Sequence, residues 1–508
     1  MTALDIARWQ FGMTTVLHFI LVPLTIGLAP MVATMQTIWV VTGKRAWLKA
    51  TNFFGKLYLI NFALGVATGI VQEFQFGMAW SEYSKFVGDV FGAPLALEGL
   101  VAFFMESTFL GLWIFGWTRL PKLVHLACIW LVAVGVNASA FFIIAANSWM
   151  QHPVGARFNP EKNRAELTSI WEVLTNSTTL AAFPHTVFGA WLTAGTFVAA
   201  IGGWWMVRGM RKGDPDAIEL AKSMRPVTRF GLGVMIVSAV GLGITGDVQA
   251  KLMFEQQPMK MASAESLCHT ETGASFSLLT IGTQNNCESV THVLQVPYVT
   301  SFLANGDPNS TLKGVTELQA EAVEKFGPGD YRPNLFVSYW AFRAMMGWSI
   351  GSGVLAVAGL WVTRRGRIPN QKWFSRICLI ALPTPFLANT SGWVFTEMGR
   401  QPWVVVPNPE GDPTIRLTVG QAVSGHSVTM MAFSIITFAA VYGTLYLLWF
   451  FLLRRYVIKG PNLHTPLDPP HDDDPPGDEP SGDDPPGDDP PGDERGRKAS
   501  SEHLSFAY

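Results

Sequence analysis

The chain has 508 residues, of which 49% are hydrophobic, and it contains 34 Phe and 19 Trp. Only 15% of the residues are charged, whereas a soluble globular protein carries about 25%. This composition excludes an ordinary soluble domain and favours a protein embedded in a membrane. The net charge of −2 is uninformative, because many of the acidic residues lie close to the C-terminus.

Apolar segments follow one another along the chain, and each approaches or exceeds the ~20 residues that an α-helix needs to cross a bilayer. Their apolar residues are blocked and not periodic. The segments are Val16–Val41, Leu57–Val71, Ala93–Trp117, Leu123–Ala146, Phe183–Val207, Phe230–Val248, Ala341–Val362, Ile377–Phe395 and Val428–Leu453. The sequence therefore predicts an all-α integral membrane protein of about nine transmembrane helices. Helices 1–6 fall in residues 1–250 and helices 7–9 in residues 335–460.

Lysine and arginine are concentrated in alternate connections between these segments. The basic connections lie around residues 44–56, 119–122, 208–229 and 364–376, and basic residues also follow the last segment at 454–459. The positive-inside rule places basic connections in the cytoplasm. We therefore predict that the N-terminus lies outside the membrane and the C-terminus in the cytoplasm.

Residues 251–334 form a long polar stretch between helices 6 and 7, on the predicted outer side. A connection of this length is usually functional or disordered. Cys268 and Cys287 both lie in it, in a compartment that permits disulfides, so we predict a bridge between them; two free thiols are the alternative. Cys128 and Cys378 fall in helices and are expected to be inert.

The C-terminal tail, residues 461–508, repeats Asp, Pro and Gly in variants of Asp-Asp-Pro-Pro-Gly-Asp. Proline and like charges prevent the formation of a core, so this cytoplasmic tail is expected to be disordered. We assign no chemistry to it.

Side chains that can bind a metal recur within the apolar segments, where an ionisable group is costly and indicates function. With the predicted orientation, all of them lie toward the outer face: His18, Glu98, His185, Met345 and Glu397. Haem iron takes His and Met as axial ligands, and helix bundles build such sites from facing helices. Taken singly, a buried His is more often a hydrogen-bonded core residue, Met345 a packing residue, and Glu397 a partner of Arg400. The shared depth favours a cofactor layer without naming the cofactor.

Two acidic residues lie in the third segment, with Glu106 eight residues after Glu98. In a regular α-helix this spacing puts Glu106 about 12 Å deeper, on roughly the same face. Two carboxyl groups along one face are typical of a proton relay. A pair of interhelical hydrogen bonds is the alternative.

At these residues the chain resembles subunit I of the cytochrome bd quinol oxidases, over roughly residues 1–460. The acidic tail lies outside the family pattern. The resemblance is carried by Phe11-Gly12, His18-Phe19, Val22-Pro23-Leu24-Thr25, Asn61–Gly69, Glu73–Gly77, Ala93-Pro94-Leu95-Ala96 with Glu98, Gly246-Asp247-Val248-Gln249 and Gly399-Arg400-Gln401-Pro402-Trp403.

The resemblance implies two four-helix bundles with one peripheral helix, and it implies bound haems b558, b595 and d. His185 and Met345 match the ligands of haem b558, with Arg343 close by. His18 and Glu397 match axial ligands of the other two haems, whose distribution between the two pockets stays open. The remaining matches are Glu98, an acid and further potential iron ligand at the haem d site; Glu106 and Ser139, on the proton path; Trp393, among the haems; and Arg400, near the haem propionates.

The resemblance also implies that residues 251–334 bind quinol. Lys260-Met261-Ala262-Ser263-Ala264-Glu265 fits the family's Lys-x-Ala-x-x-Glu pattern, so Lys260 and Glu265 are the candidates for quinol contact. We expect both in a solvent-side loop, away from the helices that carry His18 and Glu397. Menaquinol and ubiquinol are both open as the substrate.

The function implied is that of a quinol:oxygen oxidoreductase in the bacterial cytoplasmic membrane. It oxidises quinol outside, reduces dioxygen to water with cytoplasmic protons, and builds a proton motive force without pumping. A homologous second membrane subunit is implied, a small single-span subunit is compatible with the pattern, and no nucleic-acid partner is expected. Two alternatives remain at this point: a haem-bearing quinone reductase that does not use oxygen, and a proton-coupled transporter.

Overall fold

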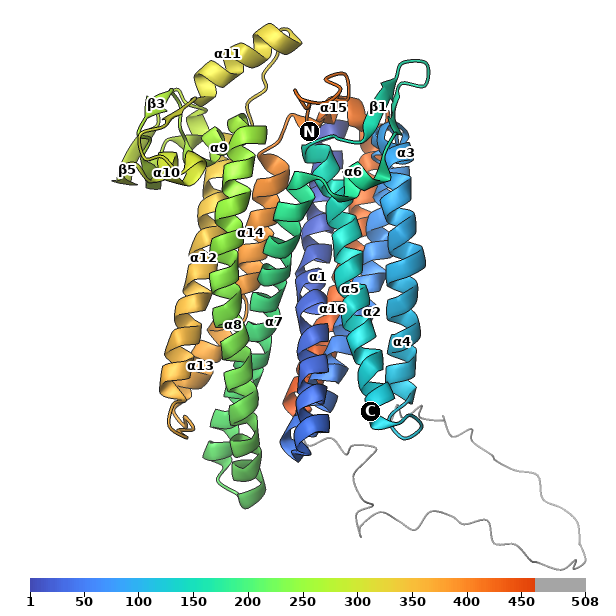
Figure 1. Ribbon diagram of the computed structural model, residues 1–508, viewed down its shortest axis with the longest axis vertical. Helices are drawn as coiled ribbons and strands as arrows, with labels where there is room; N and C mark the ends of the chain where they lie inside the picture. Colours follow the sequence, from blue (N-terminus) through green and yellow to red (C-terminus); the bar gives the residue numbers. More distant parts are fainter. Residues whose placement is uncertain (462–508) are drawn as a thin grey trace, which may run out of the picture.

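The computed structural model describes residues 1–461 and consists mainly of long helices (Figure 1). Within this part of the chain, nine helical segments are long and apolar enough to cross a membrane, which confirms the predicted all-α membrane fold. The acidic tail, for which the sequence predicts disorder, lies outside the described part of the chain from residue 462 onward. The nine segments are α1 (Ala3–Thr42), α2 (Arg45–Gly77), α3 (Ser81–Leu97) with η1 (Glu98–Phe103) and α4 (Phe104–Phe115), α5 (Lys122–Gln151), α7 (Ser177–Lys212), α8 (Pro215–Gln256), α12 (Leu335–Val362), α13 (Lys372–Ala381) with α14 (Thr384–Met398), and α16 (Val428–Lys459).

The long helices run between two ends of the molecule (Figure 1). The N-terminus and the elements that connect α8 to α12 lie at one end, which we call the loop end. The short connections that carry most of the lysine and arginine lie at the other end, which we call the basic end.

The helices pack as two neighbouring groups with α1 between them. Helices α7, α8, α12 and α14 pack on one another, while α1 packs on α2, α5 and α7, and α16 lies against α1 and α2. Small residues allow the closest of these contacts, as is usual between membrane helices. Where α7 and α8 cross, a Cβ at Gly231 would lie only 2.7 Å from the carbonyl oxygen of Gly195.

The spacing argument for Glu98 and Glu106 assumed that the third membrane segment is one regular α-helix. The structure shows that this helix is interrupted. A π-helical turn, η1, separates α3 from α4 and begins at Glu98 itself. The backbone N–H of Glu98 donates to the carbonyls of both Leu95 and Pro94. Single π-helical turns inside α-helices occur frequently at functional sites. The distance of about 12 Å expected from a uniform rise therefore does not apply across this turn.

Short elements cover the loop end. Between α8 and α12 lie α9 (Pro258–Glu265), β3 (Glu271–Thr272), β4 (Phe276–Ile281), η2 (Thr283–Asn285), β5 (Thr291–Val296), α10 (Val299–Asn305), β6 (Thr311–Leu312) and α11 (Val315–Phe326). The other connections at this end hold β1 (Ala156–Asn159), β2 (Arg164–Leu167), α6 (Ile170–Leu174), β7 (Trp403–Val405), β8 (Leu417–Thr418) and α15 (Val419–Ala422). All the strands pair antiparallel in two-stranded sheets.

A disulfide joins Cys268 and Cys287, as predicted, with 5.5 Å between the two Cα atoms. It ties the chain just after α9 to the chain just before β5. Leu267, Leu312 and Val315 pack in a small apolar cluster beside it. Cys128 and Cys378 are buried thiols.

We expect that replacing both Cys268 and Cys287 with Ser loosens the loop end while the helices remain intact. The chain-entropy model values a bridge that closes a loop of about 20 residues at ~3 kcal/mol. Limited proteolysis should then cut the segment between α8 and α12 faster than in the parent, while Cys128→Ser, a buried thiol on α5, should change little. Mass spectrometry of an unreduced digest that finds both cysteines alkylated would contradict the bridge.

Candidate functional site

His18 and His185 have the same hydrogen-bond geometry on different helices. The Nδ1 atom of His18, on α1, lies 2.9 Å from the hydroxyl of Thr68, and Nδ1 of His185, on α7, lies 3.1 Å from the hydroxyl of Thr245. Each hydroxyl already donates its single hydrogen to a backbone carbonyl one turn earlier in its own helix. With the hydroxyl hydrogen on that carbonyl, Nδ1 is the donor to the hydroxyl oxygen, and in that tautomer Nε2 of each imidazole carries a lone pair.

This arrangement is the one that a metal-binding histidine needs. A metal-ligating imidazole binds through one nitrogen, while the other donates a hydrogen bond that fixes the ring orientation. Among the described residues, no hydrogen bond engages Nε2 of His18 or of His185.

Glycines make room beside the proposed axial ligands. A Cβ at Gly69 would lie 3.2 Å from Cε1 of His18, and a Cβ at Gly246 would lie 3.3 Å from Cε1 of His185. A Cβ at Gly392 would lie 2.8 Å from the sulfur of Met345. In each case the glycine belongs to a different helix from the ligand. The donor set and the small residues around it therefore fit haem groups held between helices.

Helix α14 brings several predicted site residues together. Trp393 stacks on Phe19, the neighbour of His18, with ring centroids 4.9 Å apart. The indole nitrogen of Trp393 is buried and has no hydrogen-bond partner among the described residues. One turn further on, Glu397 forms an ion pair with Arg400 and accepts a hydrogen bond of 3.0 Å from Asn147 of α5. The pairing of Glu397 with Arg400, considered from the sequence as the simpler role, is therefore present.

The two acidic residues of the third segment both face α5. Ser139 donates to the Glu98 carboxylate at 2.7 Å. Glu106 is 5% exposed and packs at Gly135, where an added Cβ would lie 2.7 Å from its Cγ. Ser139 and Gly135 are one turn apart on α5, so the predicted common face is retained although the helix between the two acids is not regular. One carboxyl oxygen of Glu106 is buried without a partner among the described residues.

Lys260 is not in a solvent-side loop, and the expectation that it lies away from the helix of Glu397 is wrong. It is 3% exposed, and its ammonium lies 5.3 Å from the ring centroid of Phe395, on α14. The reason is that α9 packs onto the bundle instead of extending into solvent. Burial, together with the nearby Arg400 guanidinium, lowers the pKa of Lys260 to about 7.

Glu265 is also buried, at 5% exposed, and is bound to α12. Its carboxylate lies 2.6 Å from the guanidinium of Arg343. Arg343 also donates to the carbonyls of Ala264 and Ser277, at 3.2 Å and 2.6 Å, so one side chain holds α9 and β4 against α12. Burial raises the pKa of Glu265, and Arg343 opposes this shift.

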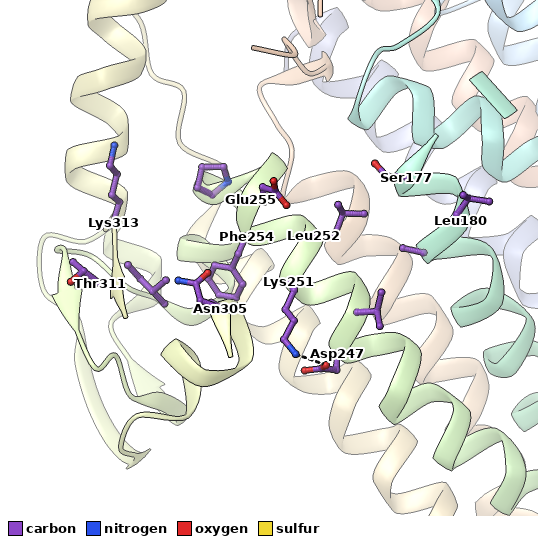
Figure 2. Close-up of a pocket in the computed structure, with 15 residues that line it drawn as sticks. Ser177, Leu180, Asp247, Lys251, Leu252, Phe254, Glu255, Asn305, Thr311 and Lys313 are labelled. Carbon is purple, nitrogen blue, oxygen red and sulfur yellow. Dashed lines mark hydrogen bonds and ion pairs between the residues drawn. The ribbon is translucent and has the colours of Figure 1, made fainter. Parts of the chain in front are cut away.

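A pocket of about 920 Å³ opens beside α9. Figure 2 shows side chains of α8 in the middle of this pocket, with Ser177 and Leu180 of α7 on one side and residues of the loop-end elements on the other. Two of the α8 residues, Lys251 and Asp247, form an ion pair of 2.7 Å. Neither Lys260 nor Glu265 lines this pocket, although Pro258, at the start of α9, does. The two candidate quinol residues instead face the bundle, against Phe395 of α14 and Arg343 of α12.

Sequence reasoning missed the polar residues that orient the candidate ligands. Thr68 and Thr245 bond the two histidines, and Asn147 and Gln151 bond Glu397 and Lys260. Asn147 and Gln151 could have been noticed as an amide pair one helical turn apart at the end of an apolar segment. The two threonines give no such signal, because a threonine in a helix commonly bonds its own backbone.

Comparison with known proteins agrees with this geometry. The family model of cytochrome bd terminal oxidase subunit I matches residues 6–461. The cytochrome bd ubiquinol oxidase subunit 1 of Bacillus subtilis is 42% identical over 93% of this chain and 97% of the relative. The cytochrome bd-II ubiquinol oxidase subunit 1 of Escherichia coli is 34% identical over 90% of this chain and 97% of the relative.

The fold has been seen before in a solved structure. The bd oxidase of Geobacillus thermodenitrificans superposes with a TM-score of 0.76 at 23% identity, over 90% of this chain and 99% of that one. That likeness concerns the fold, whereas the family match and the two relatives cover nearly the whole described sequence. The chain therefore belongs to the cytochrome bd terminal oxidase subunit I family, whose members are membrane-embedded subunits of respiratory terminal oxidases.

Proposed function

We propose that this chain is the haem-carrying subunit of a quinol oxidase that reduces dioxygen to water. The observation that carries the proposal is the pair of histidines whose Nδ1 atoms are fixed by threonine hydroxyls and whose Nε2 atoms are left with a lone pair. Haems b558, b595 and d, when bound, supply the one-electron carriers and the oxygen-reducing centre. A reduced-minus-oxidised spectrum of the purified complex that lacks a red-shifted chlorin band would exclude this function.

We assign the haem-holding roles by residue. His185 and Met345 would hold haem b558, and Arg343, on α12, anchors α9 and β4 nearby. His18 and Glu397 would hold the other two haems, and Glu98 would lie at the haem d site. Trp393 lies among the haems, and Arg400 supplies a positive charge for propionates.

The residues of the third segment hold and pass protons in this proposal. The basic end is cytoplasmic by the positive-inside rule, so a proton entering there meets Glu106 before Glu98. Ser139, which donates to Glu98, adds a hydroxyl to this path. Quinol oxidised at the loop end releases its protons outside, so charge is separated across the membrane without a pump.

Quinol binding belongs to the segment 251–334 in this proposal. Lys260 and Glu265 are its polar contacts, and the pocket beside α9 is the opening from the membrane surface. Both side chains are paired here, with Gln151 and with Arg343, so quinol has to replace or share a partner. Menaquinol and ubiquinol are both candidate substrates. A homologous second membrane subunit completes the oxidase, and a small single-span subunit is compatible with it.

We expect Met345→Leu to remove the low-spin b558 signal while the fold survives. The change conserves volume, which costs less than about 1.5 kcal/mol in a packed core, but it removes the sulfur ligand. The matched control is Met346→Leu, at the neighbouring position of α12. An unchanged b558 spectrum in Met345→Leu would exclude Met345 as a ligand, and His185→Ala should lose the same signal.

We expect Glu106→Gln to slow oxygen consumption by about 100-fold or more, the lower end of the usual contribution of general acid–base catalysis. Glutamine keeps the shape and hydrogen bonding of the side chain but cannot release a proton. Oxygen uptake should be normalised to haem content, which we expect to be unchanged. Glu98→Gln should also disturb the haem d spectrum. Near-normal turnover of Glu106→Gln would mean that the residue only braces α4 against α5.

We expect Lys260→Met and Glu265→Gln to lower quinol oxidase activity while all haem spectra survive. Each removes a polar contact with quinol but no axial ligand. Lys325→Met, an exposed lysine on α11, is the control and should behave as the parent does. Loss of the haem d band in either test variant would contradict the assignment to quinol.

A further inference from the structure

A continuous line of hydrogen bonds joins α9 to α14 through the last turn of α5. Lys260 donates to the side-chain oxygen of Gln151 at 3.1 Å. The amide nitrogen of Gln151 donates to the side-chain oxygen of Asn147 at 2.9 Å. The amide nitrogen of Asn147 then donates to the Glu397 carboxylate at 3.0 Å. Two uncharged amides thus connect a lysine to an acid on another helix.

While Lys260 carries its proton, the chemistry of the two ends fixes the direction of every bond in this line. A lysine ammonium can only donate and an ionised carboxylate can only accept. Gln151 must therefore present its oxygen to Lys260 and its nitrogen to Asn147, and Asn147 must present its nitrogen to Glu397. Rotating either amide by half a turn would place two donors or two acceptors against each other. The side-chain positions of Lys260 and Glu397 are therefore linked.

The surroundings hold this line in place. Lys260 and Gln151 are 3% and 5% exposed, so little water is available to replace a lost bond. Gln257 donates to the backbone carbonyl of Gln151 at 3.2 Å. At the other end, Arg400 binds the second oxygen of Glu397 and donates to the carbonyl of Val404 at 2.8 Å. Hydrogen bonds in such a dry region polarise one another and are costly to leave unmade.

We propose that Asn147 and Gln151 are positioning residues that couple the quinol-binding lysine to the axial residue Glu397. When quinol engages Lys260, the ammonium shifts relative to Gln151, the two amides follow, and the orientation of the Glu397 carboxylate changes. The inference rests on the proposed roles of Lys260 in quinol binding and of Glu397 as a haem ligand. It adds two residues of α5 that neither touch quinol nor ligate iron.

Three variants separate the links of the line. Gln151→Met keeps the length of the side chain and removes both of its hydrogen bonds. Gln151→Glu keeps an acceptor for Lys260 but removes the donor to Asn147. Asn147→Leu keeps the approximate shape and removes the bond to Glu397. The matched control is Gln36→Met, because Gln36 is a buried amide with two partners, Trp113 and His125, near the basic end of α1.

The test uses the purified, haem-loaded complex and a heptyl-substituted hydroxyquinoline N-oxide, which mimics quinol but cannot be oxidised. In the parent, saturation with this mimic should shift the absorption bands of the haem in the Glu397 pocket. In all three α5 variants the shift should disappear although the mimic still binds. Because coupling is reciprocal, breaking it should change the affinity of the mimic by about five-fold, the lower end of usual couplings. Gln36→Met should keep both the shift and the affinity.

The variants also distinguish coupling from simple support of the fold. Gln151→Glu should lose the band shift and change the affinity for the mimic as the other two variants do, although Lys260 keeps an acceptor, because the link to Asn147 is broken. A structural role alone predicts that Gln151→Met and Gln36→Met lose thermal stability to a similar extent and that both keep the shift. A shift that persists in Gln151→Met and Asn147→Leu, or that is absent from the parent, would overturn the proposal.

A separate variant shows whether a failure lies in the coupling or in the proposed function. If Glu397→Gln retains every haem band of the parent, Glu397 is not a ligand, and both the assignment and the coupling fall. If Glu397→Gln alters a haem band while the α5 variants keep the shift, only the coupling falls.

Discussion

A polar side chain inside a membrane-spanning bundle has little water to bond, so its hydrogen-bond partners come mainly from the protein itself. This constraint shapes the described part of the chain. The hydroxyls of Thr68 and Thr245 bond histidines, Ser139 bonds Glu98, and the last turn of α5 bonds both Lys260 and Glu397. Because these pairs cross between helices, the same bonds that satisfy buried polar groups also fix how the helices stand relative to one another.

Helices α5 and α14 contribute most of these polar contacts between helices. Along one side of α5, Gly135 receives Glu106, Ser139 bonds Glu98, and Asn147 and Gln151 lead to the loop end. On α14, successive turns meet Met345 and Phe19, then Lys260 and Asn147. Two helices therefore connect the candidate proton-relay acids, the candidate iron ligands and the candidate quinol residue Lys260, which explains why the site extends over so much of the sequence.

The loop end is held to α12 through the side chain of Arg343, and a disulfide closes a loop within this segment. Arg343 binds Glu265 and two backbone carbonyls, and the disulfide of Cys268 closes the chain immediately after α9. As a result, α9 lies on the bundle and its polar residues face inward. A short helix in this position can respond to a ligand in the neighbouring pocket and contact α5 and α14 at the same time.

The sequence alone determined the nine apolar segments, the alternation of basic connections and the residue types of the site. Long apolar runs allow only one kind of fold in a bilayer, and an ionisable residue within such a run is rarely incidental. The predictions for His18, His185 and Glu397 rested on their shared depth in different helices and on the family resemblance, because each position alone favoured a simpler role. The Cys268–Cys287 pairing was also accessible, because those are the two cysteines of one connecting stretch.

Only the tertiary structure decided the contacts between residues far apart in the chain. The π-helical turn at Glu98 depends on a local backbone choice that spacing cannot reveal. The inward position of Lys260 depends on how α9 packs against α14, and the sequence pattern of a polar connection predicted the opposite. Asn147 and Gln151 gained their significance from partners at positions 260 and 397, more than a hundred residues away, because a hydrogen bond is set by geometry in space.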